Sequence, residues 1–449
     1  MALTGIQIYK FLPKTNCKVC GFPTCLAFAM KLSQGQVELT KCPDVSEEAK
    51  QALAAASRPP MKMVTIGAGE RKMEVGGETV MFRHDKKFFH PAALVMRIKD
   101  TDSDADLSKK VKDITDYSVK RVGMTFGLDG IAIQNASGNA AKFAAAAAAV
   151  KGKTNLPLIL ISTDPAAMSA ALDKTADAKP AIYGANKDNI DKMIELAKKH
   201  KVALGIRGNG LEELTGLSEK AEAAGVADLI LDPGTRGFSD SLVALTQMRR
   251  LAIKSSFRPM GFPTITFPGE GVSSLNEEAV LAAQFVAKYG SIIVLDTFSP
   301  AMIYPLITLR LNIYTDPQKP IQMASGIYPI GNATADSPFC VTTNFSLTYF
   351  TIAGELESTG VPSWLMVCDT EGLSVLTAWS AGKFDAEKIA KTAKDQNAAS
   401  KVNHKKLILP GKVAVLRGEL EDELSDWKIM VGPMEAMDIG GWFKNNWKN

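Results

Sequence analysis

The sequence predicts an α/β protein in three parts: a small cysteine-bearing N-terminal domain, a central (β/α)8 barrel of the TIM type, and a C-terminal doubly wound, Rossmann-like domain. Three observations lead to this prediction. Four cysteines gather near the N-terminus, strand-like and helix-like segments then alternate eight times, and a second alternating series follows a proline-bearing break. The predicted domains are residues 1–58, 59–315 (with a short β extension before the barrel) and 316–449.

The composition is that of a soluble globular protein. Of the 449 residues, 46% are hydrophobic and 22% are charged, and the formal net charge is only +4. No block of Lys and Arg suggests a nucleic-acid partner. Residues 1–5 lack the basic and apolar regions of a secretory signal, and no apolar run is long enough to span a membrane. We therefore expect a cytoplasmic protein.

The N-terminal cysteines Cys17, Cys20, Cys25 and Cys42 have the spacing C-x2-C-x4-C-x16-C. In a reducing compartment such clustering points to a metal site rather than to disulfides. A [4Fe–4S] cluster needs four converging thiolates, of which a tight loop can supply three and a distant residue the fourth. Structural zinc usually takes two close pairs of ligands, so iron–sulfur is favoured while zinc stays open.

Short elements surround this segment. We expect helices over 25–38 and 46–57, and the sequence Ser-Arg-Pro-Pro at 57–60 breaks the second helix at a candidate domain boundary. The β extension is expected to hold strands at 61–66, 72–75 and 79–83, with a Gly-Gly turn at 76–77 between the last two.

The barrel prediction comes from the count of alternating units and from the near-continuous apolar strands, which are typical of a parallel sheet covered by helices. The expected strands are 92–98, 130–134, 156–162, 180–184, 202–206, 227–231, 262–267 and 291–296. The expected helices are 107–121, 139–151, 165–176, 187–200, 211–224, 239–255, 273–289 and about 300–312.

Polar residues follow most of these strands, at the end where barrel enzymes carry their active sites. They are Asn135, Ser162 to Asp164, Asn186, Arg207 to Asn209, Asp232 to Gly234, and Asp296 with Thr297. For each residue alone, capping of the following helix is the favoured interpretation, because Ser, Thr, Asp and Asn commonly start helices.

A break at 315–320 precedes the third domain. Its expected strands are 339–342, 363–368, 407–409, 413–416 and 429–431, and its expected helices are 344–357, about 375–381, 385–399 and one beginning at 434. Ligands of such sheets bind beyond the carboxyl ends of the strands. Three turns there are candidates, Cys340–Ser346, Thr370–Ser374 and Gly432-Pro433, although plain turn chemistry explains these residues equally well.

Several common motifs are missing. The dinucleotide motif G-x-G-x-x-G and the P-loop are absent, and none of the four histidines has a metal-ligand spacing. No Ser-His-Asp set is visible either. Cys340 and Cys368 lie in apolar strand-like contexts, where the favoured interpretation of each is a small buried residue.

Three sequence pieces give the chain a resemblance to a known family. They are CKVCGFPTC with Cys42, LMVCDTEGLSVLTAW, and VGPMEAMDIGGWF near the C-terminus. With the barrel between them, they closely resemble the large subunit of the corrinoid iron–sulfur protein of the anaerobic acetyl-CoA pathway, over essentially the whole chain.

The resemblance implies a methyl-group carrier, a component of a methyltransferase system. The cobalt of a cobamide would accept a methyl group from methyltetrahydrofolate through a separate methyltransferase and pass it to acetyl-CoA synthase, the carbon monoxide dehydrogenase partner. The chain would pair with a small barrel subunit, with the cobamide between that barrel and the C-terminal domain. The four cysteines would ligate the [4Fe–4S] cluster. The cobamide contacts would be Cys340, Thr343, Asn344, Ser346, Thr370, Glu371, Gly372, Leu373, Ser374, Gly432 and Pro433.

The resemblance also implies how the cofactors work together. No Asp-x-His-x-x-Gly motif supplies a lower imidazole, and no histidine lies in the three turns, so the cobamide would be base-off. The cluster would return an electron to Co(II). Domain motion is expected at the joints 58–60 and 316–320. Two other classes stay open: a pterin-binding methyltransferase using strand-end residues such as Asn186 and Asp232, and an iron–sulfur electron carrier or scaffold.

Overall fold

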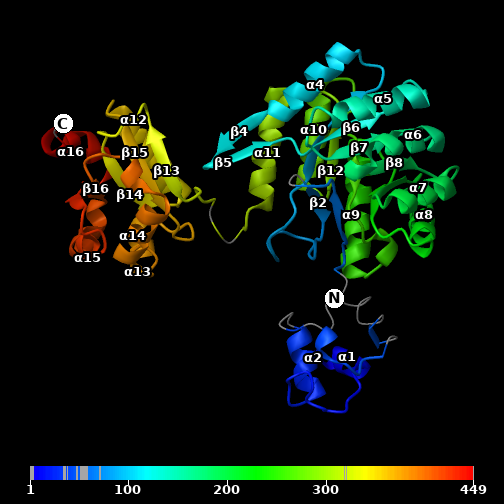
Figure 1. Ribbon diagram of the computed structural model, residues 1–449, viewed down its shortest axis with the longest axis horizontal. Coiled ribbons are helices and arrows are strands. Elements are labelled where there is room, and N and C mark those ends of the chain that lie inside the picture. Colours follow the sequence, from blue (N-terminus) through cyan, green and yellow to red (C-terminus); the bar gives the residue numbers. More distant parts are fainter. Residues whose placement is uncertain are drawn as a thin grey trace. The chain divides into compact units, whose positions relative to one another are not determined.

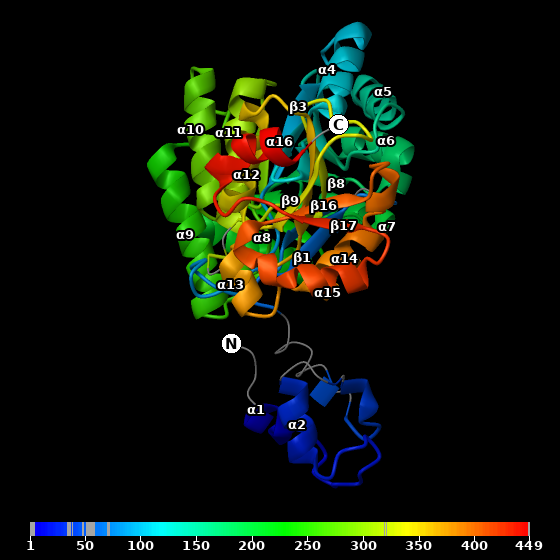
Figure 2. The same ribbon diagram turned by 90° about the vertical axis from the view of Figure 1, so that its left-hand side faces the viewer.

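The computed structural model describes residues 5–33, 37, 39–46, 49–50, 59–69, 72–317, 319 and 321–447. The chain forms two compact units. The first holds Met1–Tyr117 and Gly127–Tyr314, and the second holds Ser118–Phe126 and Thr315–Asn449. Figures 1 and 2 show the elements of each unit from two directions. Among the described residues, no helix combines the length and the apolar character needed to cross a bilayer.

Two short helices carry the cysteine segment. Helix α1 spans Gly5–Phe11 and α2 spans Cys25–Ser33, so the helix predicted over 25–38 ends earlier than expected. A 3-10 turn, η1, follows at Leu39–Lys41. The small core between them buries Phe28 and Ala29 completely or nearly so. Most of the helix predicted over 46–57 lies outside the described residues.

The β extension is a single antiparallel hairpin. Strand β1 (Met63–Ile66) pairs with β2 (Met73–Gly76). The predicted third strand at 79–83 is wrong, because the partner of the second strand lies before it in the sequence rather than after it. Alternate residues of the hairpin are buried, with Val64, Ile66 and Val75 at most 1% exposed.

The predicted barrel is confirmed. Its eight strands are all parallel, in the order β10-β9-β8-β7-β6-β3-β12-β11, and a parallel bridge from Leu231 to Thr264 joins the two end strands. The strands are β3 (Ala93–Lys99), β6 (Gly130–Gln134), β7 (Leu158–Ile161), β8 (Ala181–Ala185), β9 (Leu204–Arg207), β10 (Leu229–Asp232), β11 (Ile265–Thr266) and β12 (Ile292–Leu295).

Eight helices alternate with these strands. They are α4 (Asp104–Asp116), α5 (Ala140–Lys151), α6 (Pro165–Thr175), α7 (Ile190–His200), α8 (Leu211–Ala223), α9 (Phe238–Lys254), α10 (Leu275–Ala287) and α11 (Pro300–Tyr314). Side chains of Ser103, Asn139, Asp164 and Ser274 accept backbone N–H bonds at the starts of α4, α5, α6 and α10. At Asp164, capping is thus the role that the structure supports.

One segment between α4 and β6 departs from the barrel pattern. The helix predicted over 107–121 ends at Asp116, and a hairpin of β4 (Ser118–Arg121) and β5 (Met124–Gly127) follows. Residues 118–126 of this hairpin belong to the second unit. The helix ends there because Tyr117 is extended and the chain turns into strand pairing.

The second unit is built on an open sheet of five strands, in the order β13-β15-β14-β16-β17. The elements are β13 (Gly326–Ile330), β14 (Phe339–Thr343), α12 (Ser346–Ser358), β15 (Ser363–Cys368), α13 (Val375–Ser380), α14 (Ala386–Asp395), β16 (Lys406–Leu409), η5 (Gly411–Leu416), α15 (Arg417–Glu423), β17 (Lys428–Val431) and α16 (Ile439–Asn446). Four strands run parallel, and β13 pairs antiparallel at one edge. The order of the parallel strands reverses beside β14, which makes that strand the switch point.

Two sequence predictions fail in this unit. The strand predicted over 413–416 is the 3-10 helix η5, in which Val413 and Leu416, three residues apart, are the buried side chains. The edge strand β13 was not predicted, because Pro329 interrupts its pattern, and only an edge strand tolerates a proline. The core buries Phe339 and Phe384 completely against α14 and η5.

Candidate functional site

The cysteine loop wraps in an unusual backbone conformation. Between the two short helices, Lys14, Asn16, Lys18 and Gly21 all have φ between +50° and +83°. Non-glycine residues rarely adopt this left-handed region, and they persist there only where the surroundings fix them. The succession of left-handed residues coils the chain so that Cys17 and Cys20 lie on a tight loop ahead of α2.

The four thiols share one neighbourhood. Cys25 and Cys42 are buried, Cys20 is half-buried, and Cys17 is exposed. Burial raises the pKa of the Cys42 thiol, and the charges of Cys20, Cys25 and Cys17 raise it further, against a backbone hydrogen bond at Asp44 that lowers it. Mutual influence of this kind means that the four sulfur atoms would repel one another as thiolates, which a bound cation would reverse.

The donor set fits an iron–sulfur cluster. The Asn16 N–H donates to Cys25 Sγ at 3.4 Å, a contact of the kind that tunes cluster potentials, and the Asn16 side chain accepts from the Cys25 N–H at 2.8 Å. In the part of the chain that the structure describes, no three Cys, His, Asp or Glu side chains surround one point closely enough for a single metal ion. Cluster thiolates occupy separate corners, so they stand further apart than the ligands of one zinc ion.

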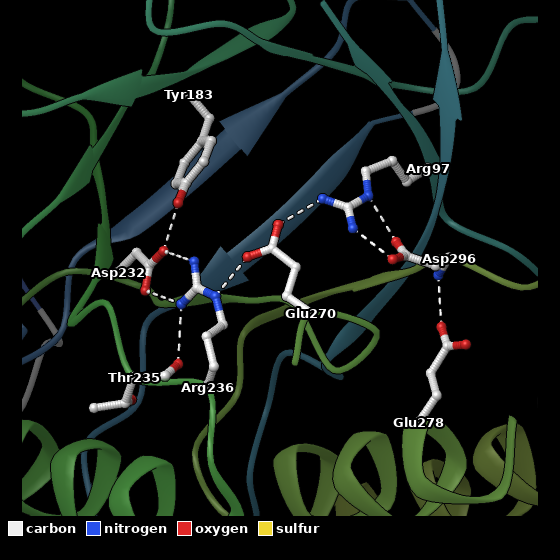
Figure 3. Close-up of polar contacts among 8 residues, drawn as sticks. All are labelled: Arg97, Tyr183, Asp232, Thr235, Arg236, Glu270, Glu278 and Asp296. Atoms are coloured by element: carbon white, nitrogen blue, oxygen red, sulfur yellow. Dashed lines mark hydrogen bonds and ion pairs between the residues drawn. The ribbon is translucent and has the colours of Figure 1, made fainter. Parts of the chain in front are cut away.

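The mouth of the barrel, where the carboxyl ends of its strands meet, holds a chain of ion pairs (Figure 3). Arg97 of β3 donates from Nε and Nη2 to Asp296 at 2.6 and 2.5 Å, and from Nη1 to Glu270 at 2.6 Å. The other oxygen of Glu270 accepts from Arg236 Nε at 2.6 Å. Arg236 completes the chain with two bonds to Asp232 at 2.9 and 3.1 Å.

Aromatic groups support these charges from beneath. The Phe267 ring lies 5.6 Å from the Arg97 guanidinium carbon and 5.2 Å from that of Arg236. Tyr183 packs on Phe267 with ring centres 4.9 Å apart, and its hydroxyl donates to Asp232 at 2.5 Å. A guanidinium that is bonded in its plane and stacked on its face is held in one orientation.

The pKa directions follow from this packing. Burial alone would raise the pKa of Glu270, but hydrogen bonds from Arg97 and Arg236 outweigh it and hold the pKa below its ordinary value. Burial works against the charge of Arg236, yet its bonds to Asp232 raise the pKa of the guanidinium. Burial, followed by the charge of Asp232, raises the pKa of Tyr183 well above its ordinary value. At neutral pH Glu270 is therefore ionised, and Arg236 and the Tyr183 hydroxyl keep their protons.

Two of the remaining strand-end residues bond to neighbouring loop residues. Asn135 donates to Ser162 Oγ at 3.1 Å, and Asn186 accepts from the Asp188 N–H at 2.9 Å. Asp232 and Asp296 instead belong to the ion-pair network. The strand-end pattern located this edge correctly, but the spacing could not reveal Arg236 or Glu270, which lie in the loops after β10 and β11.

The second unit has a cleft of about 380 Å³ on one face of its sheet. Cys340 of β14 and Ile408 of β16 form its floor, and Gly432 and Pro433 close its end. Side chains of α12, α13 and α16 form walls, among them Leu347, Thr351, Leu376 and Trp442, and Lys412 of η5 and Met434 of the loop after β17 also line the cleft. The lining is mainly apolar with a few polar groups, the usual character of a site for an organic cofactor.

Four of the predicted cobamide contacts line this cleft: Cys340, Ser374, Gly432 and Pro433. At Gly432 the backbone approaches closely, since a Cβ there would stand 3.0 Å from the Ile408 side chain and 3.1 Å from the Leu409 carbonyl oxygen. Burial raises the pKa of the Cys340 thiol to about 12, so this thiol is protonated at neutral pH. None of the residues that line the cleft is a histidine.

The other predicted contacts build the turn beside the cleft. Asn344 is 3% exposed, and its Oδ1 accepts from the Thr370 N–H, the Thr370 hydroxyl and the Gly372 N–H at 3.0, 2.9 and 2.9 Å. Its Nδ2 donates to Gln322 at 3.2 Å and to Asp369 at 3.0 Å. Asn344 thus uses both its oxygen and its nitrogen to hold the turn 369–372.

The predicted residues around this turn are likewise engaged. Glu371, at φ +57°, pairs with Lys383, and Ser346 donates to the Ile321 carbonyl. Thr343 is fully buried, and its hydroxyl has no hydrogen-bond partner in the structure. Leu373 packs against the core. The sequence located the turn, but it could not show that Asn344 faces the protein rather than a ligand.

Sequence reasoning missed the helix side chains of the cleft. Leu347 and Thr351 stand one turn apart on α12, and Trp442 lies on α16. Exposed apolar side chains lie at the rim of the cleft: Leu347 and Met434 line it and are 66% and 63% exposed, and Met437, next to the lining residue Ala436, is 76% exposed. Apolar residues on an otherwise polar helix surface are the signal that could have found them.

A thiol-rich loop, a parallel barrel and an α/β unit with an open apolar cleft define a class of multidomain proteins that combine a metal-binding segment with a separate cofactor-binding unit. The comparisons with known proteins agree with this class. Residues 63–443 match the family model of the CO dehydrogenase/acetyl-CoA synthase delta subunit, and residues 12–43 match a model described as a putative Fe–S cluster.

Among curated proteins, the corrinoid/iron–sulfur protein large subunit of Moorella thermoacetica is 45% identical over 99% of this chain and 99% of its own. The acetyl-CoA decarbonylase/synthase complex subunit gamma 1 of Methanosarcina mazei is 38% identical over 98% of each chain. A dihydropteroate synthase from Thermus thermophilus covers 55% of this chain and 98% of its own, with 16% identity and a TM-score of 0.39. The chain belongs to the family of the corrinoid/iron–sulfur large subunits and their archaeal gamma-subunit counterparts.

Breaking the ion-pair network should destabilise the barrel. Arg236→Ala leaves Asp232, which is 1% exposed, without its main cation, and we expect a loss of about 3 kcal/mol in unfolding free energy. All five tryptophans lie in the second unit, so tryptophan fluorescence reports the unfolding of that unit alone. Circular dichroism also reports the barrel and should therefore record the loss. An unchanged dichroism midpoint would contradict the assigned role of the network.

The network also predicts a pH dependence. Because the pKa of Glu270 is lower in the folded state than its ordinary 4.5, its contribution is complete above pH 4.5 and is lost as the pH falls through the folded value. Glu270→Gln should remove this part of the acid sensitivity. The measurement is the unfolding free energy of the wild type and of Glu270→Gln at low salt, from about pH 3 to about pH 7, a range that brackets the titration of Glu. If the two proteins lose the same free energy as the pH falls, the prediction is contradicted.

Removing the Asn344 side chain should loosen the turn beside the cleft. Asn344→Ala leaves buried donors of Thr370 and Gly372 without an acceptor, and we expect a loss of about 3 kcal/mol in the tryptophan-detected transition. Thr377→Ala is the matched control, because Thr377 is exposed and its side-chain hydroxyl bonds to Ser374 Oγ, at 3.0 Å. Equal losses in the two variants would argue against the role given to Asn344.

Proposed function

We propose that this chain is the large subunit of a corrinoid/iron–sulfur protein and acts as a methyl carrier of the acetyl-CoA pathway. The observation that carries the proposal is the 45% identity, along nearly the whole length of both chains, with the Moorella thermoacetica protein of that name. Its reaction belongs to methyl transfer of class 2.1.1, and its place is the cytoplasm, where reducing conditions keep thiols free.

The first cofactor of the proposal is a [4Fe–4S] cluster on Cys17, Cys20, Cys25 and Cys42. What supports it is the coiled loop, the shared electrostatic neighbourhood of the four thiols and the family match over residues 12–43. Asn16 orients the loop by bonding both the backbone and the sulfur of Cys25. The cluster domain as a whole serves reductive reactivation of the second cofactor.

The second cofactor is a cobamide held by the second unit. When bound, it supplies a cobalt atom that accepts and releases a methyl group, while the cluster supplies single electrons. A cobamide is larger than a drug-sized ligand, so the cleft receives only part of it and the apolar rim meets the rest. Cys340, Ser374, Gly432 and Pro433 contact the bound part directly, and Asn344 holds the turn 369–372 in place.

We propose further that no protein side chain ligates the lower face of the cobalt. No histidine lines the cleft, and the Cys340 thiol, with its raised pKa, stays protonated and is a poor ligand. A base-off cobamide without an imidazole ligand is easier to reduce, which suits a nucleophilic Co(I) state. Partner proteins would then reach the cobalt from the open side of the cleft.

The rim suggests where partners meet the chain. Leu347, Met434 and Met437 are more than half exposed beside the cleft, a costly arrangement unless something covers them. In this proposal the small barrel subunit covers part of the cobamide and this rim. A methyltransferase that uses methyltetrahydrofolate delivers the methyl group, and acetyl-CoA synthase, with its CO dehydrogenase partner, receives it.

The barrel has a supporting role in this proposal. The carboxylates at its mouth already pair with Arg97 and Arg236, so a pterin could use them only by breaking buried ion pairs. This observation disfavours the pterin-binding alternative for this chain. A plain electron carrier would leave the cleft of the second unit without a use.

The cluster assignment predicts metal content. The purified wild-type protein should hold about four iron atoms per chain, as one cubane cluster requires. Cys42→Ser should lose most of this iron, whereas Cys368→Ser, a buried cysteine in the second unit, should keep it. Iron analysis and the visible spectrum provide the measurement. Zinc in place of iron in the wild-type protein would exclude the cluster.

The cobamide assignment predicts that obstructing the cleft removes cobalt. Thr351 of α12 lines the cleft and is exposed, so Thr351→Trp would place an indole in the cleft. We expect cobalt binding to fall at least tenfold (about 1.4 kcal/mol or more), with the iron content unchanged. Glu357 is exposed on the same helix but does not line the cleft, so Glu357→Trp serves as the control. Normal cobalt content in Thr351→Trp would place the cobamide elsewhere.

A further inference from the structure

The β4–β5 hairpin has an unusual place in the chain. It begins after α4 and ends before β6, so both of its ends continue into barrel elements. Its residues 118–126 nevertheless belong to the second unit, although the rest of that unit starts roughly 200 positions later, at Thr315. The chain therefore contributes a hairpin to the second unit before it has formed the remaining strands of the barrel.

The tip of the hairpin is strained. Val122 and Gly123 have φ of +46° and +75°, the pattern of a type I′ turn, which favours Asn or Asp followed by Gly. A β-branched residue is a true outlier in the left-handed region, and such strain persists only where packing fixes it. Val122 is only 5% exposed, so its side chain is packed rather than displayed at the turn.

The contacts of the tip lie in the second unit. The Val122 carbonyl accepts from the Ala324 N–H at 3.0 Å. Gly123 has no room for a side chain, because a Cβ would stand 2.2 Å from the Tyr328 hydroxyl and 3.1 Å from Ala324 Cβ. Tyr328 is fixed in turn, since its hydroxyl donates to the Ala324 carbonyl at 2.7 Å and its ring packs edge-on against Tyr349 of α12.

The segment that receives the tip also reaches the turn beside the cleft. Beside Ala324, the Met323 N–H donates to the Asn344 carbonyl at 2.8 Å, and Gln322 accepts from the Asn344 side chain at 3.2 Å. Gln322 also packs under Gly372, where a Cβ would come within 2.9 Å of it. One short stretch, residues 322–324, thus joins the hairpin tip to the turn that Asn344 holds.

We propose that the β4–β5 hairpin is a latch through which the barrel chain grips the second unit and supports the turn beside the cleft. With the tip docked, the second unit is bound to the barrel chain at the hairpin as well as through the connection after Tyr314. With the tip released, only that connection remains, and the unit moves as a freer body. That this motion serves methyl transfer rests on the proposed function; the latch itself does not.

Hydrogen exchange of the full-length protein tests the latch. Gly123→Ala removes the space that Tyr328 needs, and amides of 118–126 and 322–328 should exchange at least about tenfold faster. Gly138→Ala is the matched control, because Gly138 also has positive φ, +67°, but nothing lies within 4 Å of its added Cβ. It should leave both segments unchanged. Unchanged exchange in Gly123→Ala would overturn the proposal.

A double variant guards against general misfolding. Tyr328→Phe removes the atom nearest to the added Cβ, so Gly123→Ala with Tyr328→Phe should recover part of the protection that Gly123→Ala alone loses. Lack of any recovery would mean that the single variant acts by another route, and would overturn the assigned contact.

The width of the distance distribution between the two units supplies the second readout. Fluorescent labels at the exposed helix positions Lys192 and Lys394, introduced as unnatural amino acids, should give a broader distribution in Gly123→Ala than in wild type or Gly138→Ala. An identical width in all three would refute the latch. Cobalt content, measured in parallel, distinguishes this outcome from failure of the proposed function, because the latch predicts altered exchange with or without bound cobamide.

Discussion

Parallel strands deliver their carboxyl ends to one edge of a sheet, and this constraint shapes both units of the protein. Every loop that follows a strand then meets its neighbours at that edge, so polar and flexible residues collect there. The barrel and the open sheet obey the same rule with opposite results. In the barrel, the charged side chains that collect there form ion pairs with one another. In the second unit, the edge beside the switch-point strand β14 stays open as a cleft.

The difference between the two edges is a difference in how polar groups are satisfied. Arg97 and Arg236 alternate with three carboxylates, so each of these charges has a neighbour of opposite sign. None of the five charged groups is left unpaired at the mouth of the barrel. At the other edge, one amide, Asn344, satisfies the backbone of a whole turn and leaves the adjoining apolar surface free. A carrier of a large cofactor needs the second arrangement, because access matters as much as affinity.

Much of this architecture could be predicted from the sequence. The barrel strands read as apolar runs because both faces are buried, and the four-cysteine spacing specifies convergent thiols. The failures have physical causes. Val413 and Leu416 looked like strand residues because an apolar run gives no period when it is four residues long. The hairpin at 118–126 was missed because its turn, Val122-Gly123, lacks the Asn or Asp that usually precedes Gly there, and because the residues that dock the tip lie far along the chain.

The candidate site was predictable at the level of loops but less so at the level of atoms. Cys340, Ser374, Gly432 and Pro433 line the cleft, while Asn344 and Thr370 turn inward. Sequence reports which groups can make hydrogen bonds, and only the fold decides whether a backbone donor or a ligand reaches them first. The side chains of α12 and α16 escaped notice because helix faces are not marked by turn residues.

The strained tip at Val122 also bears on how the protein is made. A ribosome releases this hairpin long before it synthesises Ala324 and Tyr328, which hold the tip in place. The nascent barrel must therefore grow around a loop whose docking partner does not yet exist, with an unpaired strand edge exposed to its neighbours. The second unit can therefore be completed only after residues 324–328 have been synthesised, when they can bind a hairpin that left the ribosome much earlier.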